Sequence, residues 1–376
     1  MNFLQKLYKT FPVLLTVMVS ASMNSEAIAQ TEYSISLQVP ETKIFPKLYY
    51  PASVIDRRVH KSDGNILSSD GKKIPVTFET DLATSIFQYA DAKISSDTNL
   101  APVSILIEKL HFSDVGSVAK HTLSLEFKLS IVRYLEGQEI SLYSTNGRPS
   151  FISTGVTTGL AEKLLMQGLD ALLSGFEKYA NENSEQPAFC NSSESILIYN
   201  DEYTNYLDAD TIRWKEDYKL NWDDFQGKPD KSSPFSAQSN CMFAFKSMVE
   251  YKSGLMRFSI FLYPCFTKKA SWVVPDKKQD ALLQHEQLHF DICELYIRKL
   301  RKKISSMTFP IIEPAELIKV EFNQAWADYQ QAQALYDDES QHGIIEKEQK
   351  RWEEYVKNQL KLLEDFATRL PPTQVK

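Results

Sequence analysis

Between residues 30 and 180, alternating apolar and polar positions come first and a helical pattern follows. The stretch TLSLEFKLSIVRY, residues 122–134, places Leu, Phe and Ile on one face and polar side chains on the other. That period of two is typical of a half-buried strand. Apolar runs at 103–112 and 139–144 indicate neighbouring strands, and residues 159–180 carry leucines at helical spacing. Strands followed by one covering helix predict a two-layer α+β domain.

A polar, turn-rich segment, residues 181–194, is predicted to link this domain to a second one at 195–376. Within the second domain, residues 242–264 predict a hairpin that turns near Lys252-Ser253-Gly254. Further α-helical patterns lie at 314–336 and 344–366, with a turn-like insert, DDESQHG, between them. The pattern as a whole predicts an α+β protein of two domains, the second with a small antiparallel sheet.

A longer helix is expected before these two. No glycine or proline occurs between Lys277 and Ser306, so one continuous helix is predicted there. Asp276 with Gln279 three residues later resembles a capping box, which places the start of the helix near Lys277.

The first residues have the pattern of a secretory signal peptide. Lys6 and Lys9 precede a short apolar run, and small residues follow, so cleavage is expected after Ala29 and residues 1–29 are assigned to the signal. The run is too short for a resident transmembrane helix, and no later segment is apolar enough to span a bilayer. We therefore expect an exported protein, periplasmic or extracellular, without an integral membrane segment.

Charge and cysteine content narrow the function classes. The net charge of -7 and the lack of a basic block argue against nucleic acid as a partner. Four cysteines in an exported chain allow disulfides. Cys241 and Cys265 each lie 12 positions from Ser253, so a cross-strand disulfide is expected if the register brings them together. Cys190 and Cys293 pair or stay free.

The chemistry-bearing motif is His285-Glu286-x-x-His289, within the predicted long helix. On a helix, His285 and His289 lie one turn apart on the same face, so both imidazoles can bind one zinc ion. Glu286 lies about 100° round the helix. It is placed to act as the general base for a zinc-activated water that attacks a carbonyl.

A third ligand must come from elsewhere in the chain. Glu294 points to the opposite side of the helix, and Cys293 fits better as a core or disulfide cysteine. The next helix offers Glu321 and Asp328. We favour His342, in the turn after that helix, with Asp337 as the alternative.

The second domain resembles family 922 of the domains of unknown function, whose members are predicted secreted zinc-dependent proteases of the HExxH zincin type. The stretches that carry the resemblance are LNWDDFQGKPD, SWVVPDKKQDALLQHEQLHFDICELYIRKLRKK and YDDESQHGIIEKEQKRWEEYV. The resemblance implies a zincin-like fold and roles for His285, Glu286 and His289. It also matches Tyr336-Asp337 and His342-Gly343, which strengthens His342 and Asp337 as site residues.

Two functions follow as expectations. The first is a secreted zinc metallopeptidase that hydrolyses peptide bonds in a peptide or protein substrate, with Glu286 as base and Tyr336 as a donor to the developing oxyanion. The hairpin at 241–265 would offer an edge strand to an extended substrate. The alternative is a non-catalytic zincin-fold binding or structural protein of the cell envelope, which holds zinc in a structural role or holds none and acts through its N-terminal domain. An intact Glu286 favours the enzyme.

Overall fold

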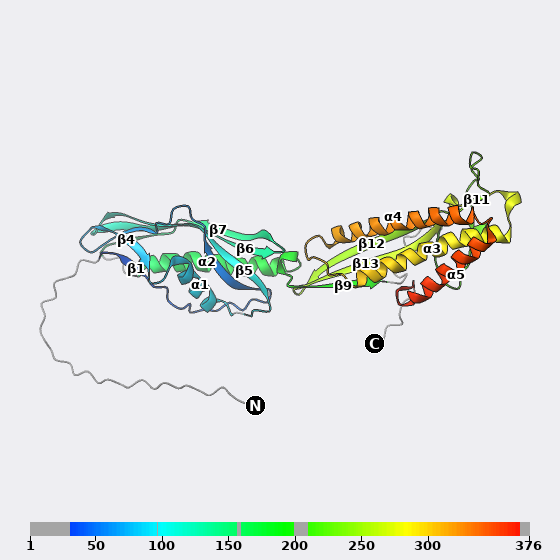
Figure 1. The fold of residues 1–376 in the computed structure, drawn as a ribbon. Coiled ribbons are helices and arrows are strands. Elements are labelled where there is room, and N and C mark those ends of the chain that lie inside the picture. The colour runs from blue at the N-terminus through cyan, green and yellow to red at the C-terminus, as the bar shows by residue number, and fades with distance from the viewer. Residues whose placement is uncertain (1–30, 96, 156–158, 199–209, 369–376) are drawn as a thin grey trace, which may run out of the picture.

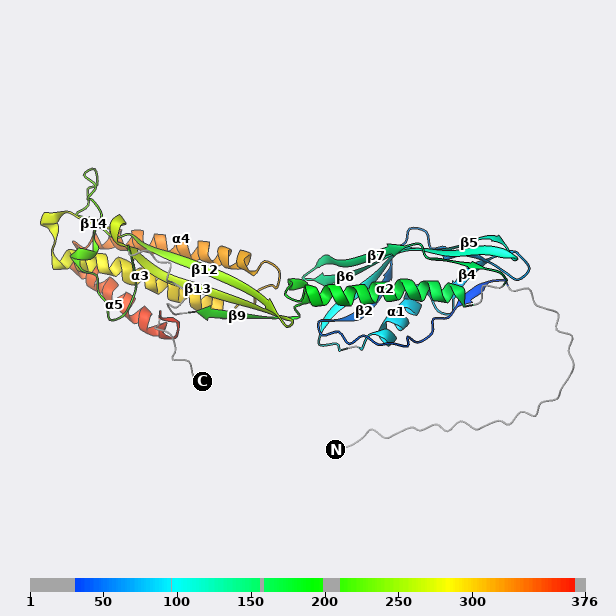
Figure 2. The same cartoon turned by 180° about the vertical axis from the view of Figure 1, so that it is seen from behind.

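The computed structural model describes residues 31–95, 97–155, 159–198 and 210–368. The described residues contain five α-helices and several β-sheets, so the predicted α+β class is confirmed. Figures 1 and 2 show two lobes arranged end to end. We call described residues 31–189 the N-terminal lobe and the described residues from 190 onwards the C-terminal lobe. The predicted signal peptide, residues 1–29, lies outside the described residues.

The N-terminal lobe is built on an eight-stranded sheet with the order β1-β4-β3-β5-β6-β7, in which β2 also pairs with β5 and β8 with β6. Its strands are β1 (Tyr33–Ile35), β2 (Tyr49–Asp56), β3 (Gly64–Leu67), β4 (Lys73–Phe78), β5 (Ala101–Ser117), β6 (Lys120–Leu135), β7 (Gln138–Gly147) and β8 (Ser150–Ser153).

Two helices pack against this sheet. α2 (Leu160–Glu182) lies along β6 and β7, and α1 (Leu82–Lys93) contacts β2 (Figure 2). The alternation predicted for β6 is present, because Leu123, Leu125 and Leu129 are fully buried. They join the α2 leucines in one hydrophobic core. The strand-then-helix pattern read from the sequence therefore describes this lobe, although α1 was not anticipated.

A buried ion pair in this lobe makes its stability depend on pH. His121 Nδ1 lies 2.7 Å from Asp114 Oδ1, and His121 Nε2 lies 2.8 Å from the Gly155 carbonyl oxygen. Burial opposes the charged imidazolium, but these two acceptors outweigh it, so the pKa of His121 is raised above 6.5. The stabilisation is therefore complete below pH 6.5 and is lost as pH rises through the folded-state pKa.

We expect His121→Gln to destabilise the lobe by about 1.5–3 kcal/mol at pH 6, the range for a charge-assisted hydrogen bond, and by less at pH 8.5. Thermal unfolding of both proteins at the two pH values measures this difference. His111, an unburied histidine on β5, supplies the control variant His111→Gln. An equal effect of His121→Gln at both pH values would mean that the buried imidazole is neutral.

The C-terminal lobe has a four-stranded sheet and a separate two-stranded one. In the larger sheet β13 is central, pairing with β12 and β10 antiparallel and with β9 parallel. The strands of the lobe are β9 (Ser192–Ile198), β10 (Thr211–Arg213), β11 (Ala237–Gln238), β12 (Cys241–Lys252), β13 (Leu255–Thr267) and β14 (Trp272–Val273). β11 and β14 form the small antiparallel sheet.

Three helices cover the larger sheet (Figure 1). α3 (Asp280–Ser305) packs on β12 and β13, and both α4 (Pro314–Ser340) and α5 (Glu346–Leu362) pack on α3. Apolar side chains from these strands and helices form a second hydrophobic core. Among the described residues, no helix combines the length and apolarity that crossing a bilayer requires.

Two helix boundaries differ from the prediction. α3 begins at Asp280 rather than near Lys277, because Pro275–Lys277 forms a 3-10 turn first. Gln279 is the N-cap residue, and its side chain makes no capping hydrogen bond, so the expected capping box is absent. α4 continues four residues past Tyr336 to Ser340, into the insert expected to be a turn. This last extension decides the composition of the candidate site.

Hydrogen bonds and apolar packing, as well as the connecting chain, join the two lobes. At the tip of the β6–β7 hairpin, the Glu136 carboxylate accepts hydrogen bonds from the backbone N–H groups of Ile311 (2.6 Å) and Ile312 (3.1 Å). Leu135, beside it, is buried in the core of the C-terminal lobe. The segment expected as a linker is packed as well, because Phe189 and Cys190 are both 1% exposed.

Candidate metal centre

The two histidines of the motif face each other on α3. Their Nε2 atoms are 3.2 Å apart, and their ring centroids are separated by 4.7 Å. His285 is almost fully buried, and the side chain of His289 is 14% exposed. One helical turn between them places both lone-pair nitrogens on the same face of α3, as the spacing predicts.

Asp337 on α4 completes a triangle with these nitrogens. Its Oδ1 lies 3.3 Å from His285 Nε2 and 3.1 Å from His289 Nε2. The oxygen is buried and has no hydrogen bond of acceptable geometry among the described residues. Three ligands around a tetrahedral zinc at bond lengths of about 2.0–2.1 Å lie about 3.3 Å apart. The three edges therefore match the size that one such ion requires.

Within the described part of the chain, these three residues are the single group of metal-ligating side chains that converge in this way. Burial alone would raise the pKa of Asp337, but the adjacent imidazoles of His285 and His289 outweigh it and lower that pKa. Burial lowers the pKa of His289, and the neighbouring Asp337 carboxylate more than reverses this. The carboxylate is thus held ionised, which is the form that binds a cation.

Two glutamines orient the imidazole rings. Gln333 Oε1 lies 2.5 Å from His289 Nδ1, and Gln349 Oε1 lies 3.4 Å from His285 Nδ1. Gln333 also donates from Nε2 to the His289 backbone carbonyl at 2.9 Å. An acceptor at Nδ1 favours the tautomer with its proton there, which leaves the Nε2 lone pair free for a metal.

Glu286 is held from the side of β11. The Ser239 hydroxyl donates to Glu286 Oε2 at 2.5 Å and lies 3.3 Å from the Glu286 backbone carbonyl oxygen. The Glu286 residue is 3% exposed yet lines the same cavity as the histidines. Oε1, the other carboxylate oxygen, makes no hydrogen bond with a described residue.

These side chains line a cavity of about 670 Å³. One wall is the segment 234–239, another is the first half of α3, and a third is the end of α4 with the turn that follows. β12 contributes Cys241 alone, and no β13 residue lines the cavity. The hairpin at 241–265, expected to offer an edge strand, therefore borders this cavity less than the segment around β11 does.

His342 lies beside the triangle rather than within it. Its Nδ1 is 3.4 Å from Asp337 Oδ1, its side chain is 46% exposed, and its ring centroid lies 4.5 Å from that of Phe235. The geometry therefore favours the alternative, Asp337, over His342 as the candidate third ligand. The reason is the length of α4, which carries Asp337 on its last turn towards α3 and leaves His342 in the turn beyond.

The role expected for Tyr336 is also corrected. Its side chain is fully buried, and its hydroxyl donates to Gln349 Oε1 at 2.6 Å, away from the cavity. Burial raises its pKa strongly. Its ring packs against His285 at 4.8 Å and His289 at 5.0 Å. Tyr336 therefore supports the histidines and is not placed to donate to an oxyanion.

The expected Cys241–Cys265 disulfide is absent, and the register explains why. The hairpin turns through two residues, Ser253 and Gly254, so Cys241 faces Phe266 and Cys265 faces Met242. One position of offset puts the two cysteine side chains on opposite faces of the sheet. All four cysteines are free thiols.

The turn after α4 approaches the site closely. Gln341, His342 and Gly343 all have positive φ. A Cβ added to Gly343 would lie 3.0 Å from His285 Cβ and 3.2 Å from its Nδ1. Any side chain at this position must push the His285 ring, so only glycine fits without displacing a candidate ligand.

We expect Gly343→Ala to cost about 1–3 kcal/mol of stability through backbone strain, and also to weaken zinc binding. Gly137→Ala is the matched control: Gly137 has φ 80 against 78 at Gly343, and an added Cβ there meets nothing within 4 Å. Zinc titration and chemical unfolding of both variants separate the effects. Equal zinc affinity in the two variants would show that the contact between a side chain at position 343 and His285 does not affect zinc binding.

Sequence reasoning missed Gln333, Gln349 and Ser239. A signal for part of this set was present. Residues at spacings of three and four along α4 share the face that contacts α3, and this series comprises Tyr329, Gln333, Tyr336, Asp337 and Ser340. No comparable pattern marks Ser239, which follows a two-residue strand.

Comparisons with known proteins give limited further information. A protein from Xanthomonas campestris of the family DUF330, whose crystal structure is known, is similar to part of this chain. The two share 11% sequence identity with a TM-score of 0.27, and the match covers 41% of this chain and 96% of that one. An uncharacterized protein of known structure is 10% identical with a TM-score of 0.20, covering 41% and 98%. No curated protein matches the chain. Residues 266–343, which include the motif, Asp337 and His342, match the family described as "Bacterial protein of unknown function (DUF922)", as the resemblance of the C-terminal half predicted.

Proposed function

We propose that the C-terminal lobe is a zincin-like zinc-dependent peptidase of the HExxH type, acting on a peptide or protein substrate. The observation that carries the proposal is the triangle of His285 Nε2, His289 Nε2 and Asp337 Oδ1, whose edges are 3.1–3.3 Å long. Its oxygen corner is buried and has no hydrogen bond among the described residues. When bound there, zinc supplies a Lewis acid at the wall of the cavity.

The remaining chemistry belongs to residues of the chain. Glu286 lies in the cavity with one oxygen fixed by Ser239, and it takes a proton from an attacking water at Oε1. The glutamine partners hold the imidazole planes, so little reorganisation is needed during the reaction. The segment 234–239 offers backbone groups beside an extended peptide.

Three protein ligands favour catalysis over a purely structural role. Structural zinc sites are usually closed by four protein ligands, whereas catalytic sites keep one position open. The converging group here has three members and borders a cavity of about 670 Å³. We further propose that the protein is exported after removal of residues 1–29, and that the N-terminal lobe helps to select the substrate.

The test begins with the purified mature protein. We expect one zinc per chain by elemental analysis, and hydrolysis of an unfolded protein substrate such as casein that stops on chelation and returns with zinc. Zinc at 100 times its Kd should add about 2.7 kcal/mol to the free energy of unfolding. Zinc binding without hydrolysis would favour the structural alternative, and no zinc binding would refute the centre itself.

A further inference from the structure

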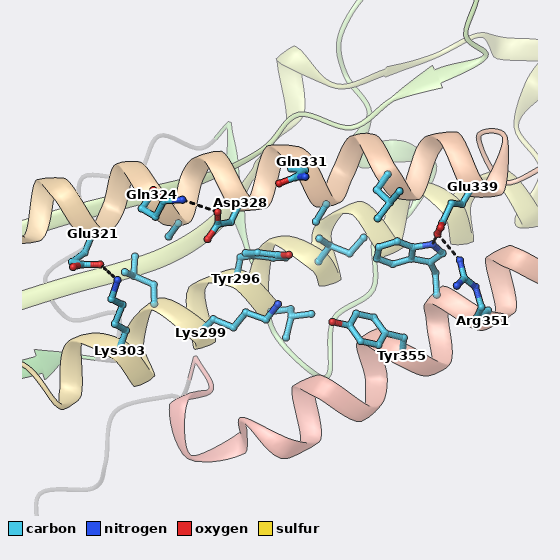
Figure 3. A pocket seen from close by; sticks show the side chains of 17 residues that line it. Tyr296, Lys299, Lys303, Glu321, Gln324, Asp328, Gln331, Glu339, Arg351 and Tyr355 are labelled. Atoms are coloured by element: carbon cyan, nitrogen blue, oxygen red, sulfur yellow. Dashed lines mark hydrogen bonds and ion pairs between the residues drawn. The ribbon is translucent and has the colours of Figure 1, made fainter.

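A second cavity, of about 640 Å³, lies between α3, α4 and α5, and it does not include the candidate metal centre (Figure 3). Its size is within the range of small-molecule sites. The wall is largely apolar, with contributions from all three helices: Ile292, Leu295, Leu300, Ala325, Ala332 and Trp352.

Most charged groups around the cavity already have partners. Lys303 pairs with Glu321 at one end, and Arg351 pairs with Glu339 at the other. Glu339 also accepts from Trp352 Nε1 at 2.7 Å. On the exposed side of α4, Asp328 accepts a hydrogen bond of 2.8 Å from Gln324 Nε2.

Apart from the exposed Gln331 amide, three donors remain. Lys299 is half-buried, its Nζ lies 4.0 Å over the Tyr296 ring, and it forms no ion pair with any described residue. The hydroxyls of Tyr296 and Tyr355 likewise have no hydrogen-bond partner in the described ranges. Figure 3 shows the Lys299 ammonium and both hydroxyls directed towards the same central space.

The Lys299 ammonium and the two tyrosine hydroxyls together favour an anionic ligand. Burial lowers the pKa of Lys299, while the exposed Asp328 partly opposes the shift, so a ligand carboxylate would restore the charge that burial disfavours. A cationic ligand would meet a lysine, and a purely apolar one would cover the half-buried Lys299 ammonium and Tyr296 hydroxyl without giving either an acceptor. The apolar wall on either side of these donors requires a ligand with an extended hydrocarbon body.

We propose that this cavity binds a monocarboxylate with an apolar chain, of the fatty-acid class. Its carboxylate lies between Lys299 Nζ and the two phenol hydroxyls, and its chain follows the wall formed by Leu295, Ala325 and Ala332. The assignment is independent of the proposed peptidase activity.

The experiment is a titration of the whole mature protein with dodecanoate below its micelle concentration, followed by tryptophan fluorescence, since Trp352 lines the cavity. Dodecanol and dodecyltrimethylammonium are the head-group controls. Lys299→Met keeps the apolar stem and removes the charge, and it should weaken dodecanoate binding by about tenfold or more. Lys302→Met, at an exposed position on the same helix, should leave it unchanged.

Ala325→Trp places a large side chain in the cavity and should abolish dodecanoate binding. Zinc content and circular dichroism should stay as in the wild type, which shows that the fold is intact. Three results would overturn the proposal: no binding of dodecanoate to the wild type, equal affinity in Lys299→Met, or dodecyltrimethylammonium binding as tightly as dodecanoate. The first would show that the cavity does not bind this class of ligand, and the last would show that binding depends on the apolar wall without selection of the head group.

Discussion

Replacing Asp337 with alanine is expected to lower the affinity for zinc by at least about 100-fold, beyond the upper end of outer-shell effects. The carboxylate is one of three converging side chains that could hold the metal, and its Oδ1 has no hydrogen bond of good geometry in the described structure. Zinc titration with a competing chelator measures the loss. The thermal shift produced by zinc should disappear in parallel, which gives a readout that does not depend on activity.

Two companion variants make the result specific. Asp338→Ala, at the exposed neighbouring position, should bind zinc as the wild type does. His342→Ala should lose about 10- to 100-fold, the range of outer-shell effects, because His342 contacts the carboxylate at 3.4 Å from outside the triangle. If His342→Ala loses zinc while Asp337→Ala retains it, the third ligand is His342 and the turn rearranges when the metal binds.

Replacing Glu286 with glutamine is expected to leave zinc bound and to reduce hydrolysis by about 10²–10⁴-fold, the usual contribution of a general base. The substitution conserves shape, and the amide oxygen can still accept the hydrogen bond from Ser239. The measurement is turnover of the casein substrate at matched zinc occupancy. Asp280→Asn, an exposed carboxylate at the start of the same helix, is the control.

Ser239→Ala refines this interpretation. Without the hydroxyl at Oε2, the Glu286 carboxylate keeps its charge but loses its orientation, so we expect a smaller loss of turnover than in Glu286→Gln and no loss of zinc. Full activity in Glu286→Gln would exclude Glu286 as the base and leave the cavity without a proton acceptor of this kind.

The sequence predicted correctly those features that depend on a single helix or strand. The alternation of β6 and the spacing of His285 and His289 depend on the geometry of one strand or one helix, so both were predicted correctly. Cys241 and Cys265 depend instead on the register between two strands. A turn of two residues rather than three separates them, and composition does not distinguish these cases.

The third ligand depended on where one helix ends. Residues 337–340 have polar side chains typical of a turn, yet they continue α4 because Ser340 and Tyr336 are buried against neighbouring elements. Tertiary packing thus overrides local preference. The same extra turn moves Asp337 towards α3, directs Tyr336 away from the cavity and places His342 outside the triangle.

The bond between Glu136 and residues 311–312 has a mechanical consequence. These residues belong to the loop between α3 and α4, the two helices that carry His285, His289 and Asp337. α3 is about 39 Å long, at 1.5 Å per residue, and both histidines lie in the half of it that is farther from this loop. A rotation of the N-terminal lobe would therefore pull on the loop that joins the two helices, and a change in the angle between them would change the separation of Asp337 from His285 and His289.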